Sequence, residues 1–224
     1  MHRVLVAENI ADPGLDALRA AGHEVDVRTG LSPEELREAI AGASGLIVRS
    51  ATQVDAELIA AAGPSLAVVG RAGVGLDNVD TVAATANGVM VVNAPESNIT
   101  SAAEHTMALL LAQARNVPQA HGALVDGRWE RSKWEGVELE DKTLGVVGFG
   151  RIGHLVAHRA AAFGMKIVAH DPFVPAEAAK HLDVEFLELD DLVASADFLT
   201  LHVAKTRETI GLINKERLGL AKPH

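Results

Sequence analysis

The chain has 224 residues, of which 48% are hydrophobic, and its formal net charge is −10. This length suffices for one large or two modest domains with buried cores, whereas the negative charge argues against nucleic acid or a membrane surface as partner. The absence of cysteine excludes disulfides and thiolate metal sites and fits a reducing, cytoplasmic location.

Strands and helices alternate through the first ~95 residues, a pattern typical of βαβ units. One helix is predicted to begin at Pro33, with Ser32 as its N-cap. Pro33 lies in its first turn, and Glu35 completes a capping box with Ser32. The predicted strands are 4–7, 24–27, 46–48, 66–69 and 89–92, and the predicted helices are 13–21, 33–41, 55–62 and 81–86. We therefore predict an α/β domain over residues 1–97 with a flavodoxin-like parallel sheet.

The longest helix signal covers residues 101–115 and opens with a capping box, Ser101 and Glu104. Its apolar positions are so numerous that we expect burial nearly all round, as suits a helix between domains or subunits. The polar stretch 126–136 contains both tryptophans and predicts a projecting loop that docks on something. Within this loop, Arg131 and Lys133 are explained equally well as solvated charges or as groups reaching a neighbouring subunit.

A glycine triplet, Gly148, Gly150 and Gly153, follows the predicted strand 144–147 and opens a helix at 155–163. In a G-x-G-x-x-G turn the first glycine permits the tight turn, the second lets backbone approach a pyrophosphate, and the third lets helix pack on strand. The positive end of the helix then holds the phosphates. Asp171 ends the next strand, 166–170, where an acidic residue binds ribose hydroxyls and favours NAD over NADP.

The remaining elements complete part of a second sheet. We predict helices at 174–181, 189–194 and 214–220 and strands at 184–186 and 197–201, the last ending at His202. A Rossmann sheet of order 3-2-1-4-5-6 would stop here at its fourth strand, leaving an open apolar edge. We therefore expect an incomplete, truncated Rossmann NAD-binding domain over residues 98–224, with little or no turnover.

Several of these segments together resemble one family. The matching stretches are Ile47–Thr52, Gly70–Asp80, Asn93–Pro95, Ser101–Thr106, Asp126–Trp129 and Leu144–Gly153 with Asp171–Pro172. On these residues the chain resembles the D-isomer-specific 2-hydroxyacid dehydrogenases, and within them the members acting on 3-phosphoglycerate. The resemblance implies a substrate domain, an NAD domain that makes a dimer together with the 101–115 helix, and a cleft between the domains. The implied reaction is NAD-linked oxidation of 3-phosphoglycerate to 3-phosphohydroxypyruvate, which enters serine and hence amino-acid biosynthesis.

The resemblance also implies site residues. By similarity Arg49 and Ser50 hold the substrate phosphate, Gly73 and Val74 lie on its carboxylate side, and Asn98 lines the cleft. The implied cofactor-binding residues are Gly148, Gly150, Arg151, Ile152, Gly153, Asp171, Pro172, His202, Val203, Ala204 and Val74. Ligands of open α/β sheets bind beyond the carboxyl ends of strands, where Arg49 and Ser50 are expected. Without the resemblance, Arg49 could equally be a surface ion-pair residue and Gly73 a turn glycine.

The chain departs from the family in three respects. No segment matches the family's catalytic Arg, Glu and His, which we expect beyond residue 224, so we assign no catalytic residue. Val74 stands where relatives often have threonine, and Val203-Ala204 replaces a usual X-Pro. Two alternatives remain open: a dehydrogenase for another 2-hydroxy acid, such as a glyoxylate or hydroxypyruvate reductase, and a non-catalytic NAD-binding scaffold or dimer partner. No His/Asp/Glu cluster has metal-ligand spacing, so we expect no metal site.

Overall fold

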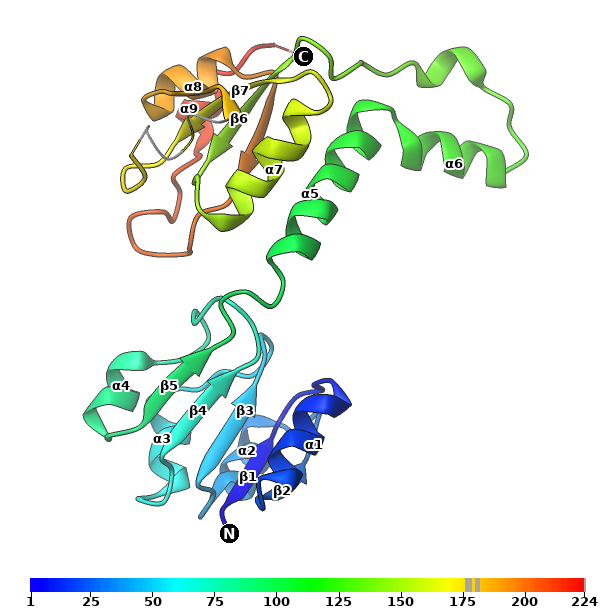
Figure 1. Cartoon of the computed structure of the whole chain (residues 1–224). Helices are drawn as coiled ribbons and strands as arrows, with labels where there is room; N and C mark the ends of the chain where they lie inside the picture. Colours follow the sequence, from blue (N-terminus) through cyan, green and yellow to red (C-terminus); the bar gives the residue numbers. More distant parts are fainter. Residues whose placement is uncertain (176–178, 180–181, 224) are drawn as a thin grey trace. The chain divides into compact units, whose positions relative to one another are not determined.

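The computed structural model describes residues 1–175, 179 and 182–223 and divides into two compact units, Met1–Asn98 and Ile99–His224 (Figure 1). Each unit contains its own parallel sheet flanked by helices, which confirms the α/β fold class. Among the described residues, none of the helices combines the length and the apolar character that crossing a membrane requires.

The first unit is a five-stranded parallel sheet of order β2-β1-β3-β4-β5, which confirms the flavodoxin-like prediction. Its strands are β1 (Arg3–Val6), β2 (Glu24–Val27), β3 (Gly45–Val48), β4 (Val68–Arg71) and β5 (Met90–Asn93). Its helices are α1 (Asp12–Ala20), α2 (Pro33–Ile40), α3 (Ala56–Ala62) and α4 (Thr81–Ala86). The strand β4 begins and ends two residues later than predicted, which places an arginine at its carboxyl end.

The core of the first unit lies between the sheet and the helices α2, α3 and α4. Leu5 and Leu46 of the sheet are fully buried there with Ile40 of α2, whereas α1 contributes no buried residue. The predicted capping box of α2 is confirmed, because Ser32 Oγ accepts the N–H of Glu35 and the Glu35 carboxylate accepts that of Ser32. Burial of apolar side chains on one face thus fixes the register of the strands.

The second unit contains a four-stranded parallel sheet of order β8-β7-β6-β9, the first four strands of a Rossmann arrangement. Its strands are β6 (Thr143–Val147), β7 (Lys166–His170), β8 (Val184–Phe186) and β9 (Phe198–Leu201). Its helices are α5 (Ile99–Ala114), α6 (Val117–Val125), α7 (Arg151–Ala161), α8 (Leu189–Ser195) and α9 (Lys215–Leu218), with a short 3-10 turn η1 (Arg131–Trp134). One core packs β6 and β7 against α5 and α7, and a smaller one packs them against α8.

Helix α5 corrects one prediction and leaves another open. It begins at Ile99, so Ser101 lies inside the helix and the predicted capping box at Ser101 and Glu104 is wrong. Within the single chain, Ala103 and Met107 face the core while Leu109 is exposed, so burial nearly all round would require a second subunit and stays a prediction. The many small and apolar residues on both faces masked this asymmetry in the sequence.

Two further segments differ from expectation. Helix α6 was not among the predicted elements, and its Pro118 lies in the first turn, where proline needs no hydrogen-bond partner. The predicted helix 174–181 lies largely outside the described residues.

Candidate functional site

A cavity of about 490 Å³ lies at the carboxyl ends of the strands of the first unit. Because parallel strands end at one edge of the sheet, segments far apart in sequence meet there. The residues that line it include Arg49 and Ser50 after β3, Arg71 at the end of β4, Gly73, and Asn98 after β5. We call this cavity the anion pocket. Four of the five predicted substrate residues therefore line one cavity, and Val74 is not among the lining residues.

The charge of the anion pocket is entirely positive. Two guanidinium groups, those of Arg49 and Arg71, line it, and no acidic residue does. Neither arginine takes part in an ion pair with the described residues, and Arg71 Nε is buried without a hydrogen-bond partner among them. Two guanidinium groups without carboxylate partners suit an anion that can accept several hydrogen bonds, such as a phosphate.

Arg71 is a site residue that the sequence reasoning missed. Its signal was available, because it follows an apolar strand just as Arg49 follows β3. The prediction that strand β4 ends at residue 69 hid it by placing Arg71 in the following loop. A Cβ on Gly73 would overlap the Arg71 guanidinium, so the glycine leaves room for this side chain to lie along the backbone.

In the loop after β4, the backbone N–H groups that are available to a carboxylate differ from those expected at Gly73 and Val74. The N–H of Gly73 donates to the carbonyl oxygen of Arg71 at 2.8 Å, so it is not available to a ligand. Asn93 at the end of β5 ties the loop down, since its Nδ2 donates to the Val74 carbonyl at 2.7 Å. The N–H groups of Val74 and Gly75 find no acceptor in the described part of the chain. The N–H groups of Val74 and Gly75, and not that of Gly73, are therefore the ones that could donate to a bound carboxylate.

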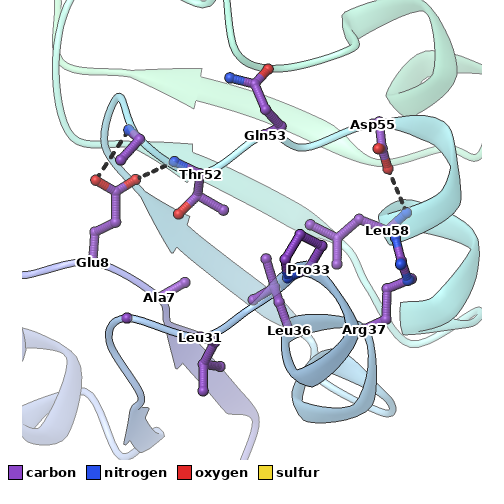
Figure 2. A pocket seen from close by; sticks show the side chains of 12 residues that line it. Ala7, Glu8, Leu31, Pro33, Leu36, Arg37, Thr52, Gln53, Asp55 and Leu58 are labelled. Atoms are coloured by element: carbon purple, nitrogen blue, oxygen red, sulfur yellow. Dashed lines mark hydrogen bonds between the residues drawn. The ribbon is translucent and has the colours of Figure 1, made fainter.

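A carboxylate that follows β1 holds the segment that carries Arg49. Glu8 accepts the backbone N–H groups of Arg49 at 2.8 Å, Thr52 at 3.0 Å and Ala51 at 3.3 Å. Figure 2 shows the hydrogen bond to Thr52. Partial burial raises the pKa of Glu8, but these hydrogen bonds lower it by more, so its pKa lies below the ordinary value. Glu8 is therefore ionised at neutral pH, and the sequence reasoning did not identify it.

The glycine triplet of the second unit forms the predicted strand–turn–helix. Gly148 has φ +90° and follows β6 directly, and its N–H donates to the His170 carbonyl at 2.8 Å. A Cβ on Gly153 would overlap the Gly148 carbonyl oxygen, so the third glycine permits the close packing of α7 on the turn. A Cβ on Gly150 would meet open space. The second glycine therefore leaves its backbone accessible from outside, as approach of a pyrophosphate requires.

The start of α7 fits a phosphate group. Gly150 is the N-cap residue and supplies no side-chain cap to the first turn, so the N–H groups at the positive end are not satisfied by that side chain. Arg151 is exposed at this end, while Ile152 packs on the core. These groups would hold the pyrophosphate of a bound dinucleotide.

Asp171 lies beside the glycine turn, immediately after β7. Its two carboxylate oxygens accept the N–H groups of Phe149 at 2.8 Å and of Phe173 at 2.9 Å. Each oxygen keeps lone pairs for further donors, so the carboxylate can also receive ribose hydroxyls. Asp171 thus has a second role that the sequence did not indicate, since it fixes the turn itself. Pro172 follows it and is exposed.

The segment after β9 forms the other side of the turn. The His202 N–H donates to the Val147 carbonyl at 2.8 Å, and a Cβ on Gly148 would approach both the His202 carbonyl and the Val203 side chain. Burial lowers the pKa of His202, whose Nε2 lies 2.8 Å from the Thr200 hydroxyl, so the imidazole is neutral at pH 7. Ala204 is exposed and its carbonyl accepts the Thr209 hydroxyl at 2.6 Å. His202 and Val203 thus border the turn, the first through its backbone carbonyl and the second through its side chain.

Metal ligation finds no support in the described part of the chain, where no three His, Asp or Glu side chains gather in a way that could hold an ion.

Comparison with known proteins gives consistent results. The D-3-phosphoglycerate dehydrogenase of Mycobacterium tuberculosis is 54% identical over 222 residues, which cover 98% of this chain and 41% of that protein. The structure of TT0316 protein from Thermus thermophilus matches with a TM-score of 0.89 and 40% identity, over 98% of this chain and 70% of that one. NAD-dependent formate dehydrogenase from Staphylococcus aureus in complex with NAD matches with a TM-score of 0.88 and 32% identity, over 100% of this chain and 71% of that one.

The chain thus spans about 41% of the length of the curated relative. The sequence model described as D-isomer specific 2-hydroxyacid dehydrogenase, NAD binding domain, matches residues 107–224, the part that contains the glycine turn, Asp171 and His202. The cofactor of this domain is NAD. With the glycine turn, the uncapped helix start and the acidic strand end all in place, the chain belongs to the D-isomer-specific 2-hydroxyacid dehydrogenase family.

Proposed function

We propose that the protein of which these residues form part oxidises a phosphorylated 2-hydroxy acid with NAD, converting 3-phosphoglycerate to 3-phosphohydroxypyruvate as a step of serine biosynthesis. The observation that carries this proposal is the pair of arginines without carboxylate partners, Arg49 and Arg71, in the anion pocket. A similar protein 54% identical to this chain bears the name D-3-phosphoglycerate dehydrogenase, which supports the same substrate.

In this proposal the substrate phosphate lies between the guanidinium groups of Arg49 and Arg71 and accepts a hydrogen bond from Ser50. Two guanidinium groups match the charge of a phosphate dianion and bind it through several charge-assisted hydrogen bonds. The substrate carboxylate accepts N–H groups of Val74 and Gly75, and Asn98 lines the pocket. The residues of the first unit thus hold both charged ends of the substrate and orient the carbon between them.

When bound, NAD would supply the acceptor for the hydride that leaves the substrate carbon carrying the hydroxyl. The second unit contributes positioning: the start of α7 holds the pyrophosphate, and Asp171 accepts the adenosine ribose hydroxyls and repels a 2′-phosphate. We assign the base that removes the hydroxyl proton to the part of the relatives that this chain does not span. His202 is not that base in this proposal, because its Nε2 is engaged with Thr200.

The proposed partner is a second copy of the chain, bound through α5 and α6. Leu109 of α5 and Leu124, Val125 and Trp129 in and after α6 are exposed apolar side chains of one contiguous segment. A cavity of about 420 Å³ beside them is lined by Trp129 and Trp134. Exposed apolar patches of this kind are typical of subunit interfaces. The cytoplasm is the proposed location of the assembled enzyme.

Calorimetric titration tests the proposed substrate class. The chain is titrated with 3-phosphoglycerate, with glycerate as the matched acid without a phosphate, and with inorganic phosphate. We expect 3-phosphoglycerate to bind at least ~10-fold more tightly than glycerate, since the second anionic group engages the two arginines. Equal affinities for 3-phosphoglycerate and glycerate would favour the alternative of a dehydrogenase for an unphosphorylated 2-hydroxy acid and contradict the proposal.

A further inference from the structure

The segment Arg49–Thr52, which carries two residues of the anion pocket, is held from two sides although it has no regular secondary structure. On its N–H side, Glu8 accepts the three backbone hydrogen bonds described above. On its carbonyl side, Asn78 Nδ2 donates to the carbonyl oxygens of Arg49 at 2.8 Å and of Thr52 at 2.6 Å. The two side chains come from positions 41 or more residues before and 26 or more residues after the segment.

Asn78 is itself anchored. It is 4% exposed, and its carbonyl accepts the Val54 N–H at 2.8 Å, while Val54 and Val79 form a buried parallel bridge. Its Oδ1 has no hydrogen-bond partner in the described part of the chain, so both side-chain hydrogen bonds go to the segment. An amide fixed in this way cannot follow the segment if the segment moves.

The two side chains are chemically complementary and not interchangeable. A carboxylate only accepts hydrogen bonds, so it matches three N–H donors, whereas the amide NH₂ donates two and matches two carbonyl oxygens. A glutamine at position 8 would keep only one acceptor oxygen and would turn its NH₂ toward backbone donors. The arrangement therefore requires these functional groups and not merely polar side chains.

We propose that Glu8 and Asn78 are positioning residues of the anion pocket, which together hold Arg49–Thr52 in the conformation that presents Arg49 and Ser50 to the anion. Neither residue lines the anion pocket. Glu8 lines a different cavity of about 520 Å³ (Figure 2), so its effect on the anion passes through the backbone. This inference rests on the proposed function, because it assumes that the anion pocket binds the substrate phosphate.

Substitution of Glu8 separates positioning from simple electrostatics, because the two predict opposite signs. If Glu8 acted only through its charge, Glu8→Gln would remove a negative group near an anion site and strengthen anion binding. If Glu8 positions the segment, the same change loses N–H acceptors, frees the segment and weakens binding. Glu8→Asp keeps the charge but shortens the side chain by one methylene, so any change in affinity that it causes is due to position.

The experiment titrates the 224-residue chain with 3-phosphoglycerate and with inorganic phosphate, and follows amide exchange at residues 49–52 by NMR. We expect Glu8→Gln to weaken both affinities about tenfold and Glu8→Asp about threefold, with faster exchange of these amides. The control is Glu38→Gln, which removes the same charge from α2 and should leave both affinities within about twofold. Asn78→Ala should also weaken binding, and the double variant should lose less than the product of the single losses, since either change frees the segment.

Unchanged or tighter anion binding by Glu8→Gln, while wild type binds, would overturn the inference and leave the proposed function intact. If the double variant loses as much affinity as the product of the two single losses, Glu8 and Asn78 act independently and do not hold the segment together. If Glu8→Gln does not fold, the anion affinity of Glu8→Asp is measured instead. An affinity of Glu8→Asp equal to that of wild type would overturn the inference. Failure of wild type to bind either probe would overturn the proposed function, and the inference with it.

Discussion

A Cβ atom on Gly148 would lie 2.7 Å from the carbonyl oxygen of His202, so the ends of β6 and β9 approach each other only because residue 148 has no side chain. The same residue has φ +90°, a conformation that L side chains rarely adopt. Close approach and backbone conformation therefore both require glycine at the first position of the dinucleotide turn.

Gly148→Ala should destabilise the second unit. Forcing a methyl group against the His202 carbonyl and adopting φ +90° with a side chain should together lower the free energy of unfolding by about 2–4 kcal/mol. Urea denaturation followed by circular dichroism measures this change. Gly150→Ala is the matched control, because a Cβ there meets open space. Gly150→Ala should preserve the free energy of unfolding to within ~0.5 kcal/mol but reduce NAD affinity about tenfold. An equal loss of stability in both variants would contradict the separate roles of Gly148 in the fold and Gly150 in cofactor binding.

Asp171→Asn should change the choice of dinucleotide. The carboxylate accepts two backbone N–H groups and, in the proposed complex, ribose hydroxyls, while its charge repels a 2′-phosphate. We expect NAD affinity to fall about tenfold and the preference for NAD over NADP to shrink at least as much. Parallel calorimetric titrations with NAD and NADP give both numbers. A variant that keeps the wild-type preference would show that selectivity comes from another residue.

Arg71→Gln tests the arginine that was absent from the predicted site. Loss of one guanidinium group from the anion pocket should weaken binding of 3-phosphoglycerate about tenfold or more, and should reduce the salt dependence of binding. Arg19→Gln removes an equal charge from an exposed ion pair of α1 with Asp16. This control should alter the affinity by less than about twofold, and similar losses in the two variants would indicate a general effect of net charge.

The stability of the second unit should depend on pH through Asp197. The hydrogen bond from Lys222 and that from the Thr143 N–H hold the pKa of Asp197 below its ordinary value of 3.8. A carboxyl with a lowered folded-state pKa stabilises the fold above its unfolded pKa, and this stabilisation is lost as pH falls through the folded pKa. Wild type should therefore be more stable than Asp197→Asn above about pH 5, and the difference should vanish in stronger acid. Urea titrations between about pH 2 and pH 7 measure the difference in stability between the two proteins. A difference that does not change with pH would show that ionisation of Asp197 is not its cause.

Leu124→Glu should weaken self-association. A charge in the exposed apolar segment of α6 must be desolvated when two copies bind, so the dissociation constant should rise at least ~10-fold. Sedimentation velocity over a range of concentrations measures it. Val82→Glu places the same charge on an exposed valine of α4 in the first unit and should leave self-association unchanged. Equal effects of both substitutions would place the interface elsewhere.

Periodicity and glycine spacing were sufficient to predict both sheets, because strand burial and the turn after β6 are determined by residues adjacent in sequence. The glycine turn and the places of Asp171 and His202 at strand ends were predicted for the same reason. Glu8 and Asn78 could not be identified in this way, whereas Arg71 was missed although it follows an apolar strand. Glu8 and Asn78 act on a segment 41 and 26 residues away, and periodicity carries no information about which backbone groups a distant side chain will meet. In helix α5 the difficulty is local, since a uniformly apolar sequence does not indicate which face of the helix will be buried.

Every residue that lines the anion pocket belongs to the first unit, Met1–Asn98. The affinity for the phosphate end of the substrate should then not depend on whether NAD is already bound. Initial-velocity patterns of the whole enzyme should accordingly fit a random order of addition rather than an obligatory one.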